Sequence, residues 1–184
     1  MRRILISLLA LLCMASCGRR RNAPAQEAAA DSRPRVFLPA IAPSSLSPDE
    51  RRDYLRVHYW DRFDFTDTLF TVRADTLQMV EAYARYIALI SDRPTDGSPI
   101  DSLMRRASSS RKMLDYFSML AEQVLHDPNS PLRNYEFYIP VLRAALASPY
   151  YDEYERIGPS YDLDMAMQNR IGERANDFRY TLAS

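Results

Sequence analysis

Residues 111–125, RKMLDYFSMLAEQVL, are the stretch that decides the fold, because their hydrophobic pattern is the most regular in the chain. The apolar residues recur at intervals of three and four, so they fall on one face of an α-helix. The members of this stripe are Met113, Leu114, Phe117, Leu120, Ala121, Val124 and Leu125. A helix with one apolar face buries it against other helices, so the stretch predicts one member of a helical bundle.

The residues before this stretch carry two more helix patterns. SPDE at 47–50 is a capping box with proline at the first helical position, and it predicts a helix to about residue 63. Residues 71–92 are expected to form one continuous helix with an apolar face, which consists of Leu77, Val80, Tyr83, Ala84, Ile87 and Ile90. SPID at 98–101 repeats the start signal, and the serine run at 108–110 separates that helix from the stripe.

The residues after the stretch continue in the same way. DPNSP at 127–131 is a turn, and a helix is expected over 132–147 with a kink at Pro140, which lacks a backbone N–H. Residues 149–158 predict a short helix or turn, and residues 160–170 predict the last helix. No strand-like alternation occurs before residue 175. The sequence therefore predicts an irregular all-α bundle of about five to seven helices over residues 47–172.

Glycine is scarce, and its positions support this fold. Of the four glycines, only Gly97, Gly158 and Gly172 lie beyond the start of the chain. Each lies between apolar segments, where we expect a helix to end. A chain so poor in glycine has neither a phosphate-binding loop nor a dinucleotide fingerprint.

The first residues predict export and lipid attachment. MRR is followed by the apolar run at 4–12, which suits a signal peptide and is too short to span a bilayer. MASCG at 14–18 resembles a bacterial lipobox, so residues 1–16 are interpreted as a lipoprotein signal peptide and Cys17 as the lipidated residue. The alternative is an ordinary secretory signal with an incidental cysteine.

Residues 17–46 are predicted to be a disordered tether, because they are rich in alanine, proline and arginine and have no sustained apolar period. Arginines at 19–21 fit either contact with anionic headgroups or a solvated linker. Their positive charge also favours a protein anchored on the periplasmic face of the outer membrane of a Gram-negative bacterium. The whole chain has 24 basic and 24 acidic residues, and loss of Arg2 and Arg3 with the signal peptide leaves −2. Nucleic acid is therefore not expected as a partner.

Cysteine usage excludes thiol chemistry in the exported part. Cys13 and Cys17 are the only cysteines. Cleavage removes the first and lipidation consumes the second, so no disulfide, cysteine-bound zinc or thiol catalysis is expected. His58 and His126 lie far apart in the sequence and are read as structural rather than as metal ligands. No cofactor, metal or catalytic residue is predicted, and the chain itself is not expected to be an enzyme.

HYWDRFDF at 58–65 is the stretch richest in candidate ligand-binding residues. Aromatic rings beside carboxylates can stack against and hydrogen-bond a sugar, which makes a possible ligand or partner surface of Tyr59, Trp60, Asp61, Asp64 and Asp67. The alternative is core packing, because a helix here would carry apolar side chains around most of its circumference. Asp67 is also interpreted as a helix cap rather than as half of a carboxylate pair with Asp64.

Tyrosines gather late in the chain, within 135–161. They are Tyr135, Tyr138, Tyr150, Tyr151, Tyr154 and Tyr161. They fit a docking surface and interhelical packing equally well.

Several short motifs together resemble a known type of domain. They are HYWD at 58–61, FDF at 63–65, DPNSPLRN at 127–134, YIP at 138–140 and NRIG at 169–172. The combination resembles the uncharacterised helical N-terminal domain that precedes a thioredoxin-like, thiol:disulfide oxidoreductase module in Gram-negative lipoproteins. GERANDF at 172–178 is similar to the entry strand of that module, which makes residues 173–184 an unpaired stub. The cysteines of that module are not in this sequence, so no redox residue carries over.

The resemblance and the residues leave three hypotheses. The first is a non-catalytic, membrane-anchored interaction or spacer domain, associated with a thioredoxin-like module or with the client of that module. The second is a lipoprotein that binds a peptide or glycan. The third is the N-terminal part of a complete thiol:disulfide oxidoreductase whose catalytic domain is not in this chain.

Overall fold

The computed structural model describes residues 35–92, 97–168 and 170. These residues belong to one compact unit that begins at Pro34. The predicted signal peptide at 1–16, lipidated Cys17, most of the tether, Gly172 and the stub at 173–184 lie outside the described residues. Among the described residues, no helix has the length and apolar character needed to cross a membrane.

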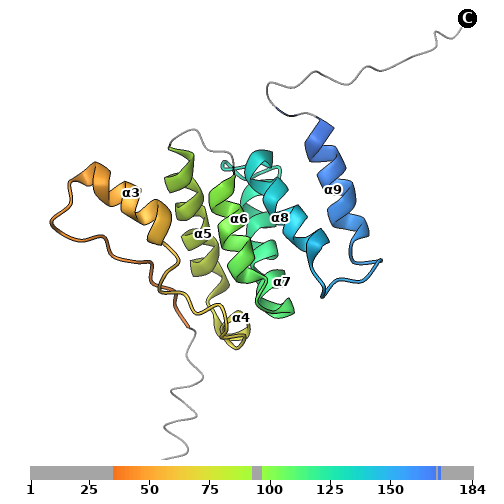
Figure 1. The fold of residues 1–184 in the computed structure, drawn as a ribbon, viewed down its shortest axis with the longest axis horizontal. Helices are drawn as coiled ribbons and strands as arrows, with labels where there is room; N and C mark the ends of the chain where they lie inside the picture. The colour runs from red at the N-terminus through yellow and green to blue at the C-terminus, as the bar shows by residue number, and fades with distance from the viewer. Residues whose placement is uncertain (1–34, 93–96, 169, 171–184) are drawn as a thin grey trace, which may run out of the picture. The chain divides into compact units, whose positions relative to one another are not determined.

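The described residues form an all-α fold, as the sequence predicts. The elements in chain order are α3 (Pro48–His58), α4 (Phe70–Arg73), α5 (Thr76–Ser91), α6 (Ser98–Ala107), α7 (Arg111–Ala121), the π-helical turn η1 (Glu122–His126), α8 (Tyr135–Ala147) and α9 (Ile157–Gln168). Figure 1 shows α5, α6, α7 and α8 packed side by side, with α3 beside α5 at one end of the array and α9 beside α8 at the other. No strand occurs in the described part; there is one isolated bridge, between Arg35 and Ala74.

The predicted helix over 71–92 is wrong in one respect, because two helices occupy this region. Arg35 donates its backbone N–H to the Arg73 carbonyl at 2.8 Å, and Asp75 donates to the Arg35 carbonyl at 3.3 Å. These bonds need an extended backbone at residues 74–75, so the helix breaks there. Asp75 then caps α5 by accepting from the Gln78 N–H at 3.1 Å.

Other predicted helix ends also differ from the structure. α3 ends at His58 rather than near 63, since the chain leaves the helix to turn its next aromatic rings inward. α8 begins at Tyr135 rather than 132, because Asn134 caps it by accepting from the Phe137 N–H at 3.4 Å. Gly158 lies inside α9 and does not end a helix.

The end of the predicted tether also packs on the bundle. Phe37 is 3% exposed, and its backbone N–H and carbonyl both hydrogen-bond to the Gln78 side chain, at 3.2 and 2.8 Å. Residues 35–46, predicted as tether, therefore belong to the folded part. Sequence composition missed this contact because one buried ring in a proline-rich segment leaves no period.

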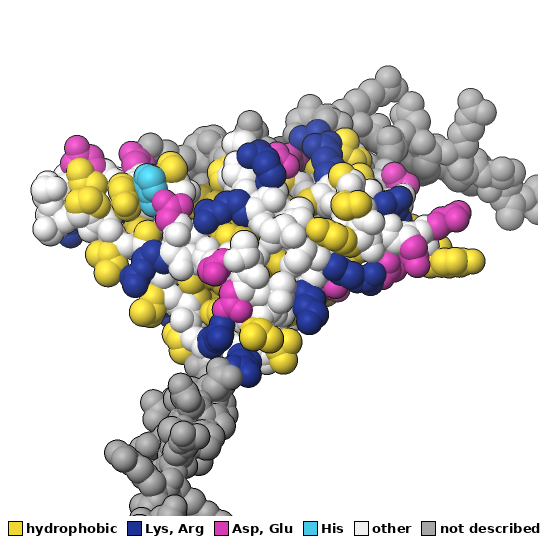
Figure 2. Space-filling view, turned by 60° about the horizontal axis from the view of Figure 1, so that its bottom comes forward, with side chains coloured by type: hydrophobic (Ala, Val, Ile, Leu, Met, Phe, Trp, Pro, Cys, Tyr) yellow, Lys and Arg dark blue, Asp and Glu magenta, His cyan; other side chains and the backbone are white. Residues whose placement is uncertain are grey.

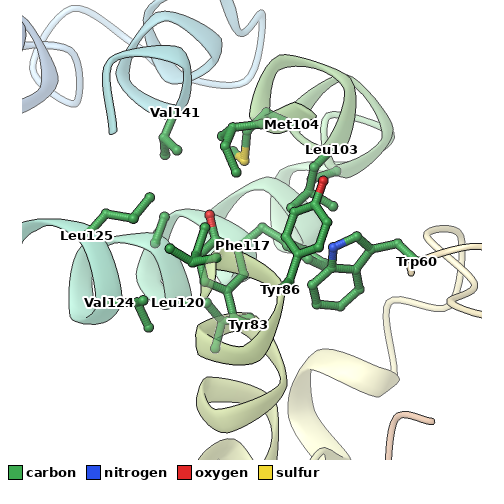
Figure 3. Packing of buried hydrophobic residues seen from close by; sticks show 14 of the residues in the cluster. Trp60, Tyr83, Tyr86, Leu103, Met104, Phe117, Leu120, Val124, Leu125 and Val141 are labelled. Carbon is green, nitrogen blue, oxygen red and sulfur yellow. The ribbon is translucent and has the colours of Figure 1, made fainter. Parts of the chain in front are cut away.

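The stripe at 111–125 is confirmed as the centre of the core. All seven of its apolar residues are buried, and they come from both α7 and η1. Figure 3 shows Phe117, Leu120 and Leu125 of this stripe facing Tyr83 of α5, Met104 of α6 and Val141 of α8. The face predicted for α5 is only partly right, because Leu77 is 70% exposed and Met79, Ala82 and Tyr86 are buried instead.

Pro140 explains why a glycine is needed at 97. Proline cannot donate to the Glu136 carbonyl, one turn earlier in α8, and Gly97 packs against this carbonyl. A Cβ at position 97 would lie 2.8 Å from the Glu136 oxygen and 3.1 Å from Pro140 Cγ. Gly97 also has φ of +80°, which disfavours any side chain.

We therefore predict opposite effects for two glycine substitutions. Gly97→Ala should lower the free energy of unfolding by about 1–3 kcal/mol, because it adds both backbone strain and a clash. Gly158→Ala should leave it unchanged or raise it by up to about 1 kcal/mol, because a Cβ there meets nothing within 4 Å. Urea unfolding of both variants measures the difference. Equal stability of the two would contradict the packing at Gly97.

Buried tyrosines predict a loss of stability in alkali. Burial raises the pKa of Tyr86 and of Tyr116 to about 12. Above pH 10 the unfolded chain releases these protons while the folded chain keeps them, so stability present below pH 10 is lost as the pH rises toward 12. Tyr116→Phe should reduce this slope by about 1.4 kcal/mol per pH unit.

The exposed Tyr154, at 81%, supplies the control, and Tyr154→Phe should leave the slope unchanged. Denaturant unfolding at several pH values measures both variants. If Tyr116→Phe follows the wild-type slope, Tyr116 ionises freely in the folded protein and is not buried as described.

Candidate functional site

The aromatic part of the predicted surface at 58–67 lies in the core. Tyr59 and Trp60 are 6% and 3% exposed. Trp60 stacks on Phe37, with ring centroids 4.7 Å apart, and meets Phe117 edge-on at 5.4 Å. The core-packing interpretation is thus confirmed for these two residues, although they belong to a turn rather than to a buried helix. Neither ring is available to stack on a ligand at the surface.

The three aspartates of that predicted surface serve local structure. Asp61 contacts His58 Nδ1 at 2.6 Å and Arg106 at 3.5 Å. Asp64 accepts from the Thr66 backbone and hydroxyl at 2.8 and 2.6 Å, and these bonds lower the pKa of its carboxyl. Asp67 pairs with Arg35 and accepts from the Leu69 N–H at 3.1 Å, at the start of α4. These bonds show aspartates that stabilise turns. The helix cap predicted for Asp67 is wrong, because the N-cap of α4 is Leu69 and no side chain caps this helix.

The two histidines are held separately, each against a tyrosine. The His58 ring stacks on Tyr54 at 4.2 Å, and the His126 ring stacks on Tyr138 at 4.9 Å. No group of three or more potential metal ligands occurs among the described residues.

The late tyrosines divide between packing and surface. Tyr138 is 6% exposed, whereas Tyr154 and Tyr161 are 81% and 64% exposed. Tyr161 lies on the outer side of α9 one turn from Ile157, which is also exposed. The packing interpretation is therefore confirmed for Tyr138, and the docking interpretation stays a prediction for the exposed Tyr154 and Tyr161. Figure 2 shows basic and acidic side chains interspersed over the face in view, with hydrophobic side chains between them.

A groove of about 490 Å³ lies between α7, η1, α8 and α9, and this is the best candidate site in the described part of the chain. Its apolar lining comes from Met119, Val141, Leu142 and Ala145. Acidic groups line it from three directions, and they are Asp115 of α7, Glu122 of η1, Asp162 of α9 and Glu155 of the preceding turn. Arg111 is the one basic residue in this lining. The groove therefore combines an apolar floor with a negative rim.

Paired groups line one end of the groove. Arg111 forms an ion pair with Glu155 and lies 3.7 Å from Asp115. The Tyr151 hydroxyl donates to Asp115 Oδ1 at 2.7 Å. Burial, reinforced by this bond to a carboxylate, raises the pKa of Tyr151. The single positive charge of the lining is thus already neutralised.

The other end contains polar groups without partners. The Tyr138 ring is almost fully buried, and its hydroxyl has no hydrogen-bond partner among the described residues. Glu122 and Asp162 line the same end, and in the described part of the chain neither side chain has an ion-pair or hydrogen-bond partner. Burial raises the pKa of Tyr138, and the negative charges of Glu122 and Asp162 raise it further. The phenol therefore stays neutral beside two carboxylates.

Two local features bring these groups together. α7 continues into the π-helical turn η1, which begins at Glu122 and ends where Asp127 donates to the Glu122 carbonyl at 2.9 Å. α9 is fixed on α8 by Ala166, which is 2% exposed, and by Arg170, whose guanidinium donates twice to the Glu136 carboxylate at 2.9 and 2.8 Å. Such π-helical turns occur frequently at functional sites.

The sequence pattern indicated Tyr138 but not its neighbours in the groove. Glu122 and Asp162 lie on elements separated by the whole of α8, and no local pattern indicates that the two elements share a groove. The surplus of acidic side chains on η1 and α9 was the only signal. In a chain of balanced charge it is too weak to identify a site.

Comparisons with known proteins give the family. Residues 16–169 match DUF5106, a domain of unknown function, so the chain belongs to this family. A crystal structure of a thioredoxin-like protein from Bacteroides caccae is similar, with 39% sequence identity and a TM-score of 0.68. The similarity covers 80% of this chain and 53% of the Bacteroides chain, so this chain spans about half the length of that relative. No curated protein matches.

The burial of Trp60 predicts a specific fluorescence result. Trp60 is the only tryptophan, so intrinsic emission reports on the core alone. We expect blue-shifted emission that iodide hardly quenches in the folded protein and quenches readily in denaturant, since the ring is 3% exposed. Free tryptophan amide supplies the control for full quenching. Efficient iodide quenching of the folded protein would place Trp60 at the surface.

Proposed function

We propose that this chain is a non-catalytic interaction module of a thioredoxin-like redox system, lipid-anchored through Cys17 on the periplasmic face of the outer membrane. The module holds a thioredoxin-like domain, or the client of that domain, near the membrane by binding a peptide segment. The lipobox at 14–18 supports the anchor, and the arginines at 19–21 support the periplasmic face.

The similarity to the thioredoxin-like Bacteroides protein carries this proposal. Over the aligned region the two chains are 39% identical, and this region makes up 53% of the relative. The described residues of our chain are all-helical, whereas a thioredoxin-like fold is built on a β-sheet. The thioredoxin-like part of the relative is therefore inferred to lie in its other half, and the shared half to be a helical accessory to it.

The residues of the groove favour binding over catalysis. Thiol exchange needs a thiolate, and lipidation of Cys17 would leave the exported part without a free thiol. Ser118 lines the groove but no histidine does, so the lining offers no nucleophile beside an imidazole base. The apolar floor and charged rim instead fit recognition of an extended peptide.

The incomplete coverage of the relative supports a second candidate. Because the chain spans about half of that protein, it also fits the N-terminal part of a complete thiol:disulfide oxidoreductase. The helical module would then act on the catalytic domain in cis. Glycan binding receives less support, since the aromatic rings suggested for stacking, Tyr59 and Trp60, are buried.

Mass spectrometry of the protein isolated from its own membranes tests the proposal. We expect a Cys17 peptide that carries diacylglycerol, and a thioredoxin-like sequence that co-purifies as a separate chain. Cys17→Ser should release the protein into the soluble fraction, and Cys13→Ser should not. Peptides that continue past Ser184 into a C-x-x-C segment would select the second candidate. An unmodified Cys17 with no thioredoxin-like sequence in either form would overturn both.

A further inference from the structure

We propose that the end of the groove lined by Glu122, Asp162 and Tyr138 binds the ammonium or guanidinium group of a lysine or arginine side chain in an extended peptide. This inference rests on the proposed interaction function and names the chemistry that the module recognises. The peptide is taken to be a segment of the partner protein.

The unpaired groups at this end set the charge of the ligand. Glu122 and Asp162 project two carboxylates from different elements toward one hollow, and neither is neutralised within the described part of the chain. A cation placed between them would form two charge-assisted contacts. No basic side chain in the described part of the chain forms these contacts. An anion would face two like charges, and Arg111 at the opposite end is already paired with Glu155.

Tyr138 adds a neutral polar group to the two carboxylates at this end of the groove. The residue is only 6% exposed, but its hydroxyl oxygen is not among the fully buried unpaired atoms, so it opens onto the groove without a hydrogen bond from the described residues. A hydroxyl that reaches the groove without a protein partner is free to bond a ligand there. A neutral phenol oxygen can accept from an ammonium or guanidinium N–H. A phenol is neutral at physiological pH, and the raised pKa of Tyr138 favours that form further.

The rest of the groove fits the stem of such a side chain. Lysine and arginine bury their methylene groups on apolar surface and keep the charged head in a polar site. Val141, Leu142 and Ala145 are buried residues whose side chains line the groove, with Met119 beside them. The volume of about 490 Å³ is within the usual range for ligand pockets. A hard metal ion fits less well, because Ca²⁺ takes about 6–8 oxygen ligands.

Isothermal titration of the full-length protein, purified from membranes in neutral detergent, tests this inference. The probe is a capped hexapeptide of alanine and serine with one central lysine, and the matched probe has norleucine in its place. We expect the lysine peptide to bind at least tenfold more tightly, with affinity that falls as salt is raised. Equal binding of both peptides overturns the inference, and so does binding of spermidine or Ca²⁺ without binding of the lysine peptide.

Matched variants locate the binding. Glu122→Gln combined with Asp162→Asn should weaken the lysine peptide by at least tenfold, and Tyr138→Phe by severalfold. Asp164→Asn should have no effect, because Asp164 is exposed on α9 outside the groove lining. Unchanged affinity in the double variant overturns the inference.

A second design blocks the groove without touching its charges. Gly158 lines the groove, and a side chain there meets open space, so Gly158→Trp should abolish peptide binding while the fold is retained. Unimpaired binding by this folded variant also overturns the inference. Failure of the lysine peptide to bind, with a lipidated protein that still co-purifies with a thioredoxin-like sequence, would refute the cation site and leave the proposed function standing.

Discussion

The packing of Trp60 between Phe37 and Phe117 is the interaction on which the rest of the structure depends. Phe37 comes from the N-terminal segment, Trp60 from the turn after α3, and Phe117 from the centre of α7, so three distant parts of the chain meet at one indole. The Phe37 and Trp60 rings lie stacked, and Phe117 meets Trp60 at an interplanar angle of 75°. Aromatic pairs prefer these offset and edge-on arrangements. Burial of these rings fixes the N-terminal segment on the bundle.

The same packing determines which face of α7 is free for function. Phe117 points into the core, so Asp115 and Ser118 of the same helix face the groove on its other side, in line with Met119 and Glu122. α8 separates the core from the groove, and its residues Val141 and Leu142 belong to both. A change in the aromatic core is therefore expected to reach the groove through α7, whereas a change in the rim leaves the core intact.

The sequence predicted the fold well where its signal was local. The stripe at 111–125, the capping box at 47–50 and the proline inside α8 all occur as expected, because each depends on neighbouring residues. The errors arise where tertiary contacts override the local pattern. Arg35 breaks the helix expected at 71–92 by pairing with residues 73 and 75, and Phe37 is recruited from a segment that reads as tether. α3 ends early because the rings after His58 turn inward.

The candidate site was predictable only in part, for the same reason. The sequence pattern at 58–67 indicated aromatic residues beside carboxylates, yet the fold uses these rings for packing and engages the aspartates in local bonds. Tyr138 was predicted only as one of a group of late tyrosines, without its acidic neighbours. Its unpaired hydroxyl acquires meaning only when η1 and α9 bring Glu122 and Asp162 to the same hollow. Such a site depends on which helices lie next to each other in space. The residues of any single helix do not predict that arrangement.

The central claim is that the domain works through this groove, and mapping the contact by NMR tests it most directly. Backbone amide shifts of the ¹⁵N-labelled protein would be followed as the capped lysine peptide is added. The account predicts that the perturbed signals cluster at η1, at the first turns of α9 and at Tyr138, while the signals at residues 58–67 stay in place. Perturbations concentrated at Asp61, Asp64 and Asp67, with the groove unchanged, would contradict it.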